Sequence, residues 1–298
     1  MKTLSCVVLE LTLTGMFPEG DRFNLWHGGL GRILKQDFPR VFDLLYAISS
    51  NQARGYALIP PTCQFPCLRL TLMGEIAEHA VALTQALIRL GSQGLSRGRY
   101  LFVVETAHAV ATNEERFLYY RHGEGILDWP KAWSADELFK EKETGHEDFS
   151  FLRLEFYTPL LLKEDNRPID GAPHFDQVVR RLLGRVSQLA HATDSGLPYT
   201  EEKAAQWQAL AATVELLDAD FALERVQRRS GRTGQQMVFS GWVGTLDYAG
   251  LLSPFQGLLQ LGEFVQLGGR TSFGFGAYRS HWARLDECVP SVSLASNQ

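Results

Sequence analysis

A glycine-rich stretch near the C-terminus, from Gln266 to Arg279, has residue types that can hold a phosphate. Glycine lets the backbone approach a ligand closely and adopt positive φ angles. Backbone N–H groups in such a turn can point together at an anion, and arginine presents a planar set of donors that suits phosphate. The residues that we expect to contact an anionic ligand are Gly268, Gly269, Arg270, Thr271, Ser272, Gly274 and Gly276.

The same stretch can instead be a tight structural turn that joins a helix to the last strand. On spacing alone the structural turn is favoured, because a single glycine-rich loop is weak evidence for a ligand site. The spacing matches neither G-x-x-x-x-G-K-[ST] nor G-x-G-x-x-G. A nucleotide-binding enzyme is therefore the weakest of the alternatives, since the Walker lysine and the Rossmann acidic residue are both missing.

The charge distribution favours an anionic partner only locally. The net charge is −5, whereas nucleic-acid-binding proteins usually carry a basic surplus. Two acid-free segments in the C-terminal third nevertheless gather arginines, and the second of them contains the glycine-rich stretch. These arginines are Arg225, Arg228, Arg229 and Arg232 in residues 225–246, and Arg270, Arg279 and Arg284 in residues 265–285.

Cysteine usage and hydropathy predict a cytoplasmic protein without a metal site. Cys63 and Cys67 lie close in sequence, but no second pair or suitably spaced histidine completes a zinc-binding set, so we expect free thiols. Polar residues in the segment Leu4 to Leu13 do not suit a signal peptide. No apolar stretch reaches the length of a membrane span, so no membrane partner is expected.

The strands and helices predicted to position these residues occur in the same order in both halves of the chain. In the first half, alternating segments predict strands and periodic apolar residues predict helices, with a break expected at Pro39 because proline interrupts a helix. The order is β-α-β-β-α-β, which is the ferredoxin-like arrangement. The expected strands are Leu4–Leu13, Arg54–Ile59, Cys67–Met73 and Tyr100–Val110, and the expected helices lie between Leu30 and Ile48 and between Ile76 and Leu90.

The second half repeats this order after a charged linker at Lys140–Phe149. The sequence therefore predicts an α+β fold of two tandem ferredoxin-like (RRM-like) domains, at residues 1–145 and 146–298, with the glycine-rich loop in the second. The expected strands are Phe151–Leu162, Ala222–Gln227, Met237–Tyr248 and Phe275–Leu285, and the expected helices are Phe175–His191, Glu201–Leu217 and Leu251–Phe264.

Four motifs in the C-terminal half occur in a recognisable order. They are Phe156-Tyr157-Thr158-Pro159-Leu160, the basic helix Arg180 to Val186, the G-x-x-G strand Ser240 to Tyr248, and Leu267-Gly268 followed by Gly274-Phe275-Gly276. Together they resemble the CRISPR-associated precursor-RNA-processing endoribonucleases of the RAMP superfamily. Gln266 stands where the family loop usually has its first glycine.

The resemblance implies tandem ferredoxin-like folds and binding of CRISPR repeat RNA, as a stem-loop or a single strand. It implies metal-independent cleavage without a cofactor, in which a ribose 2′-hydroxyl attacks the adjacent phosphate. The products would be a 2′,3′-cyclic phosphate and a 5′-hydroxyl, and the enzyme can retain its product. In such enzymes the catalytic histidine commonly lies near the first helix.

That chemistry needs a base for the 2′-hydroxyl, an acid for the leaving 5′-oxygen and a cation for the phosphate charge. We expect His27 to be the base, just before the first helix, where the positive helix end favours a neutral imidazole. Arg32 and Lys35 lie within about two turns of it and can face the phosphate. The alternative is that His27 only caps or packs the helix. Tyr46 and Tyr278 are possible hydrogen-bond donors.

RNA binding is expected on the C-terminal half. Arg181 and Arg185 share a helix face and, with Arg180, can follow a phosphate backbone, although a solvated arginine face is an equal alternative. Arg228 and Arg229 are further candidates. Phe273 and Phe275 can stack on bases or pack in the core.

Two classes of function remain open for such a protein. The leading hypothesis is an RNA-cleaving enzyme. The alternative is a catalytically inactive RAMP subunit that binds guide RNA among other CRISPR-associated effector subunits.

Overall fold

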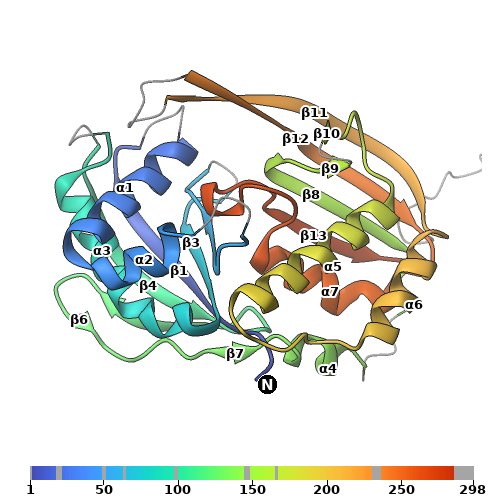
Figure 1. The fold of residues 1–298 in the computed structure, drawn as a ribbon, viewed down its shortest axis with the longest axis horizontal. Coiled ribbons are helices and arrows are strands. Elements are labelled where there is room, and N and C mark those ends of the chain that lie inside the picture. The colour runs from blue at the N-terminus through green and yellow to red at the C-terminus, as the bar shows by residue number, and fades with distance from the viewer. Residues whose placement is uncertain are drawn as a thin grey trace, which may run out of the picture.

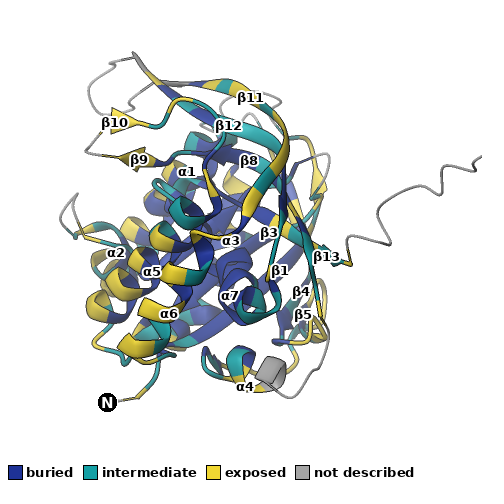
Figure 2. Cartoon of the chain, turned by 90° about the vertical axis from the view of Figure 1, so that its right-hand side faces the viewer, coloured by how far each residue is buried: buried dark blue, intermediate teal, exposed yellow. Residues whose placement is uncertain are grey.

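The computed structural model of the 298-residue chain describes residues 2–17, 22–48, 52–62, 65–96, 100–143, 148–164, 167–229 and 236–284. The N-terminal and C-terminal lobes lie side by side, and the long β11–β12 hairpin crosses above both (Figure 1). Most helices lie on one side of the molecule and the sheets on the other, as the two perpendicular views agree (Figures 1 and 2).

The N-terminal lobe has the predicted ferredoxin-like arrangement. Its antiparallel strands lie in the order β2-β3-β1-β4 and are extended by β5 and β6, while β7 pairs with β1. Proline interrupts the first helix at Pro39, as expected. The elements are β1 (Ser5–Gly15), α1 (Arg22–Asp37), α2 (Pro39–Tyr46), β2 (Tyr56–Ile59), β3 (Leu68–Met73), η1 (Gly74–His79), α3 (Ala80–Gln93), β4 (Phe102–Val110), β5 (Arg116–Arg121), β6 (Gly125–Ile126) and β7 (Trp133–Ser134).

The C-terminal lobe repeats the arrangement, with strand order β11-β12-β8-β13. The prediction of tandem ferredoxin-like folds is thus confirmed. The elements are α4 (Glu137–Glu143), β8 (Phe151–Leu160), β9 (Lys163–Glu164), β10 (Arg167–Pro168), α5 (Phe175–Ala192), α6 (Glu201–Ala211), β11 (Glu215–Arg229), β12 (Gln236–Ala249), η2 (Ser253–Phe255), α7 (Gln256–Val265), η3 (Thr271–Phe273) and β13 (Tyr278–Ala283).

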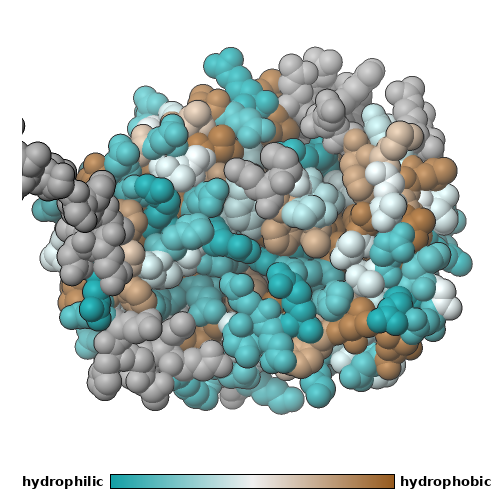
Figure 3. Space-filling model, turned by 180° about the vertical axis from the view of Figure 1, so that it is seen from behind, coloured by the Kyte–Doolittle hydropathy of each residue, from teal (hydrophilic) through white to brown (hydrophobic). Residues whose placement is uncertain are grey.

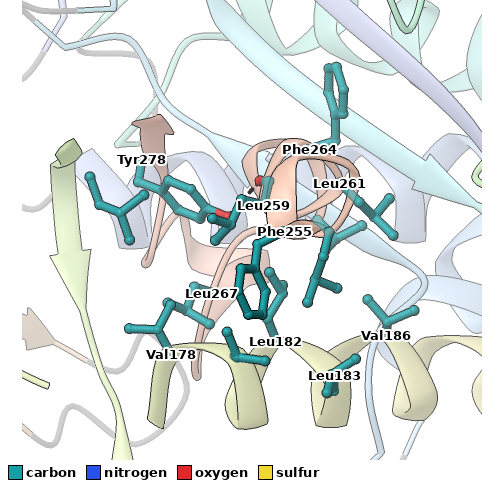
Figure 4. Close-up of a cluster of buried hydrophobic side chains, with 14 of the residues drawn as sticks. Val178, Leu182, Leu183, Val186, Phe255, Leu259, Leu261, Phe264, Leu267 and Tyr278 are labelled. Carbon is teal, nitrogen blue, oxygen red and sulfur yellow. Dashed lines mark hydrogen bonds between the residues drawn. The ribbon is translucent and has the colours of Figure 1, made fainter. Parts of the chain in front are cut away.

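The main core lies between α5, α7 and the C-terminal sheet. Apolar side chains of α5 face those of α7, and Leu267 and Tyr278 close the cluster (Figure 4). The same cluster includes Leu4 and Trp133 of the first half, so the lobes share apolar packing. The boundary predicted at residue 145 lies in 144–147, outside the described residues, and stays a prediction.

Three local predictions are wrong. Helix α1 begins at Arg22, whereas the first helix was expected to lie between Leu30 and Ile48. Helix α6 ends at Ala211 rather than Leu217, because Glu215 already pairs with Ala249 in the β11–β12 ladder. The linker expected at Lys140–Phe149 contains the end of α4.

The rear of the molecule, where the sheets lie, is largely hydrophilic in its middle (Figure 3). None of the described helices is long and apolar enough to span a membrane. Cys6 and Cys67 are free thiols, and Cys63 lies outside the described residues.

Candidate active site and RNA-binding surface

The glycine-rich loop is a compact element whose amides are largely used within the protein. Gly269 N donates to Leu161 O at 2.9 Å, and Gly276 N donates to Pro159 O at 2.9 Å. The amides of Phe273, Gly274 and Phe275 also donate to protein carbonyls. These amides are not available to an anion, so at these positions the structure differs from the anion-binding turn that the glycine spacing suggested.

Close backbone approach explains the last glycine of the loop. Gly276 has φ +76°, and a Cβ atom placed there would lie 1.8 Å from Leu267 O. Leu267 N donates to Gly276 O at 2.9 Å, which closes the loop on itself. Only glycine combines this φ with this contact.

The loop sits against the N-terminal lobe. Gln266 is fully buried, with φ +63°, and its Nε2 donates to Leu58 O of β2 at 3.2 Å. A Cβ atom at Gly274 would lie 3.0 Å from the same Leu58 O and 3.0 Å from the ring of Phe23 in α1. The loop therefore meets β2 and α1 directly, so residues from both lobes come together here.

His27 lies at this junction. Its Nδ1 is 3.0 Å from Ser272 O of the loop and 3.0 Å from the hydroxyl of Tyr56 in β2. Its ring packs on Phe273, with ring centroids 3.8 Å apart, and beside Tyr46, with centroids 4.8 Å apart. Tyr46 also donates its hydroxyl to His27 O at 2.8 Å. With 9% of its surface exposed, His27 is held firmly but still reaches solvent.

These contacts select one tautomer of the imidazole. A carbonyl oxygen only accepts hydrogen bonds, so we assign the proton of neutral His27 to Nδ1, facing Ser272 O. The Nε2 atom then carries the lone pair of the neutral ring, and the Tyr56 hydroxyl is a second acceptor for the same Nδ1–H. Burial raises the pKa of Tyr56 to about 12 and that of Tyr46 well above its usual value, so both phenols remain neutral around pH 7.

The helix-entry argument for His27 does not hold. His27 lies in the second turn of α1, which begins at Arg22, so the first-turn dipole does not act on it directly. The interaction that positions the imidazole comes instead from the glycine-rich loop, far away in sequence.

The side chains of Arg32 and Lys35, on helix α1, contact different parts of the protein. Arg32 is turned toward the end of α3, where Nη1 meets Gln93 Oε1 and Nη2 donates to Gly94 O at 3.2 Å. Lys35 is exposed, and its ammonium lies 5.9 Å from the ring of Phe42, which stacks on Tyr46. Lys35 thus lies near the Phe42–Tyr46 stack, and Tyr46 packs beside His27.

The three arginines of α5 differ in environment. Arg180 is exposed and paired with Glu164 at 3.1 Å. Arg181 is half-buried and forms no ion pair with any side chain in the described part of the chain. Arg185 is buried and donates to Thr271 Oγ1 at 2.7 Å, so it is bound to the loop from within the protein.

The β11–β12 hairpin reaches the same junction. It extends over α1 (Figure 1), and Phe239 of β12 joins Phe23 of α1 and Phe275 of the loop in one buried cluster. The guanidinium of Arg270 lies 3.6 Å from the centroid of the Phe239 ring. Phe275 is fully buried, whereas Phe273 is partly exposed. The side chains of Arg228 and Arg229 lie outside the described residues.

Tyr56 is the site residue that sequence reasoning missed. It lies on a fully buried strand, β2, where alternation gives no sign that its hydroxyl meets a histidine. Tyr278, by contrast, is buried in the core and donates to Leu259 O at 2.7 Å (Figure 4), so the structure does not bring it to His27.

Within the described ranges, no group of three or more His, Cys, Asp and Glu side chains could hold a metal ion.

The two lobes and the loop between them define a class: tandem ferredoxin-like proteins with a C-terminal glycine-rich loop. Within it, residues 154–278 match the family model of the CRISPR-associated endoribonuclease Cas6. The resemblance inferred from the four motifs of the C-terminal half is thus confirmed. No curated protein sequence matches the chain significantly.

Solved structures show the same fold over nearly the whole chain. A product complex of Cas6 matches with a TM-score of 0.60 and 19% identity, covering 94% of this chain and 100% of that one. Thermus thermophilus Cas6 matches with a TM-score of 0.59 and 19% identity, covering 94% and 99%. A partial Cas6-RT-Cas1–Cas2 complex matches with a TM-score of 0.59 and 12% identity, covering 94% of this chain and 46% of that chain.

Proposed function

We propose that the protein is an endoribonuclease that cleaves CRISPR repeat RNA to give guide RNAs. The family match and the fold shared with Cas6 product and substrate-mimic complexes support RNA processing. The observation that carries the catalytic proposal is the contact between His27 Nδ1 and Ser272 O. It leaves Nε2 as the basic atom, in a side chain held by both lobes.

In the proposed reaction, Nε2 of His27 takes the proton of a ribose 2′-hydroxyl. The 2′-oxygen attacks the adjacent phosphorus, the bond to the 5′-oxygen breaks, and that oxygen receives a proton. The products are a 2′,3′-cyclic phosphate and a 5′-hydroxyl. This transesterification needs no hydrolytic water and no metal-bound nucleophile, since the nucleophile belongs to the RNA.

A cation must stabilise the charge on the phosphate. Lys35 is our candidate, because its exposed ammonium lies on the Phe42 and Tyr46 side of α1. Arg32 remains a weaker candidate, since it is bonded to the end of α3 and would have to leave those partners.

RNA binding is proposed for the surface around the loop and α5. The half-buried Arg270, the partly exposed Phe273 and Arg181 offer a cation, a stacking ring and a second cation. Arg180 can join after exchanging Glu164 for a phosphate. Contacts on both lobes would keep the product bound after cleavage, and other CRISPR-associated subunits are possible partners of the complex.

The experiment is cleavage of the repeat RNA from the same genome in EDTA, with a series of RNAs carrying a 2′-deoxy group at each candidate position. We expect one cut, abolished by a single 2′-deoxy substitution, and a cyclic phosphate detected by mass spectrometry. Cleavage that requires added metal, or that persists with every 2′-deoxy RNA, would exclude this mechanism. Native gel electrophoresis of the completed reaction shows whether the cleaved RNA stays bound to the protein.

The second candidate is a catalytically inactive RAMP subunit. The limited exposure of His27 and the net charge of −5 favour it. Tight repeat-RNA binding without any cut, with or without metal, would establish this alternative.

A further inference from the structure

Arg185 has an unusual position for an arginine of a basic helix. Only 8% of its surface is exposed, although Arg180, five residues earlier on the same helix, is exposed. Burial lowers the pKa of Arg185 to about 10, so the side chain still carries its charge at pH 7 to 8. A buried, charged guanidinium requires partners that compensate for the lost water.

Its partners are the residue just before the glycine-rich loop and a residue within the loop. Nε and Nη2 each lie 3.4 Å from Val265 O, the last residue of α7, and Nη2 donates to Thr271 Oγ1 at 2.7 Å. The carbonyl end of a helix carries partial negative charge, which suits the cation. One side chain thus ties the start of the loop, after Val265, to its 3-10 turn, which begins at Thr271.

That turn carries the carbonyl that meets the histidine. Ser272 follows Thr271 directly, and Ser272 O lies 3.0 Å from His27 Nδ1. The turn has only three residues and is entered through Arg270, which has φ +64°. Such a short turn has few bonds of its own, so its position depends on the side chains that hold it.

Resting on the proposed function, we infer that Arg185 is a positioning residue for catalysis and not an RNA ligand. Through Thr271 it fixes the direction of Ser272 O, and Ser272 O in turn keeps the Nδ1–H tautomer of His27. Without the bond to Thr271, the carbonyl can turn away and the imidazole can exchange its tautomers. The basic Nε2 would then be present and correctly oriented for only part of the time.

The test removes the hydroxyl that Arg185 binds while keeping the side-chain shape. Thr271→Val loses the acceptor, Thr271→Ser retains it, and Arg185→Lys keeps the charge but loses the two-sided contact. A matched control is Thr84→Val, which removes a buried threonine hydroxyl from α3 and its contact with Tyr119. Three quantities are measured: the single-turnover cleavage rate at saturating RNA, the RNA Kd with its salt dependence, and the ¹⁵N NMR tautomer state of His27.

If Arg185 positions the loop, Thr271→Val and Arg185→Lys should each slow cleavage by about tenfold, which is the rate equivalent of one lost hydrogen bond. The Kd should change by less than about twofold, and the NMR signal of His27 should shift toward mixed tautomers. Thr271→Ser should restore rate and tautomer. Thr84→Val should lower the Tm and leave both unchanged.

Two results would overturn the inference. One is a weaker RNA affinity with a salt slope reduced by about one and an unchanged rate at saturation, since this describes a phosphate ligand. The other is an unchanged tautomer in Thr271→Val. A wild-type protein that binds RNA without cutting it would refute the proposed function instead, and the NMR comparison would still decide the role of Arg185.

Discussion

The Nδ1 atom of His27 lies 3.0 Å from the carbonyl oxygen of Ser272, although 245 residues separate them in sequence. One residue belongs to helix α1 of the first lobe and the other to the glycine-rich loop of the second. The relative placement of the lobes therefore determines the orientation of the proposed base. The predictions below follow from this contact and from the residues around it.

Tyr56→Phe should slow cleavage without altering the fold. The hydroxyl of Tyr56 is 3.0 Å from His27 Nδ1, and a lost hydrogen bond of about 1 kcal/mol corresponds to a rate fall of roughly fivefold to tenfold. The measurement is the single-turnover rate. Tyr119→Phe, which removes another buried hydroxyl, bonded to Thr84, is the control and should cleave like the wild type. Equal rates for both variants would contradict a role for Tyr56.

Gly276→Ala should unfold the loop region. The new Cβ atom would lie 1.8 Å from Leu267 O, so the backbone must move, in addition to the cost of about 1–2 kcal/mol for a positive φ. Gly171→Ala is the matched control, since Gly171 has φ +96° with nothing within 4 Å of a Cβ atom. Urea unfolding should show a larger loss of stability for Gly276→Ala, together with lost cleavage. Equal losses would mean that the close contact has no energetic effect.

The order of strands and helices was predictable because the periodicity of apolar residues is strong in both halves. The start of α1 was not, since Gly28, Gly29 and Gly31 each lower helix propensity by about 1 kcal/mol. Close packing explains why two of these positions are glycine. A Cβ atom at Gly31 would lie 2.7 Å from the Tyr46 ring, and one at Gly29 would lie 3.0 Å from Leu90.

The sequence predicted individual residues of the site but not the contact between them. His27 and the glycine-rich loop could each be selected from residue type and neighbours. Their contact depends on how two lobes pack, which local patterns do not encode. The same limit explains Arg185, which shares a helix face with Arg181 by spacing but lies beneath the loop and is buried there.

Arg181→Ala and Arg180→Ala should differ in their effect on RNA binding. Arg180 is already paired with Glu164 and Asp176, so a phosphate must displace those carboxylates. Arg181 has no such competition among the described side chains. If Arg181 contacts a phosphate, its removal should lower the salt slope of binding by about one, with a smaller change for Arg180→Ala. A salt slope unchanged in Arg181→Ala would place the RNA elsewhere.

Glu10→Gln should destabilise the N-terminal sheet in a pH-dependent way. Burial alone raises the pKa of Glu10, but the guanidinium groups of Arg69, at 2.5 Å, and Arg116, at 2.7 Å, outweigh it and hold the pKa below its usual value. The stabilisation is thus present above the unfolded pKa, near about 4.3, and is lost as the pH falls through the folded pKa.

The measurement for Glu10→Gln is urea unfolding at pH 7 and at pH 3. At pH 7 the variant should lose about 3–5 kcal/mol, because Arg69 is left buried without its carboxylate. The difference from the wild type should shrink at pH 3. Glu164→Gln, in an exposed pair with Arg180, should cost less than about 1 kcal/mol at either pH. A pH-independent loss for Glu10→Gln would show that its charge is not responsible.

The central claim is that His27 is the base, and its most direct test is the single-turnover cleavage rate of His27→Ala in EDTA. Loss of a general base should lower the rate by about 100-fold or more, with RNA affinity retained. His191→Ala, which removes an exposed histidine at the end of α5, should cleave at the wild-type rate. Cleavage by His27→Ala within about tenfold of the wild type, with affinity unchanged, would contradict the account and leave His27 as a packing residue at the junction of the lobes.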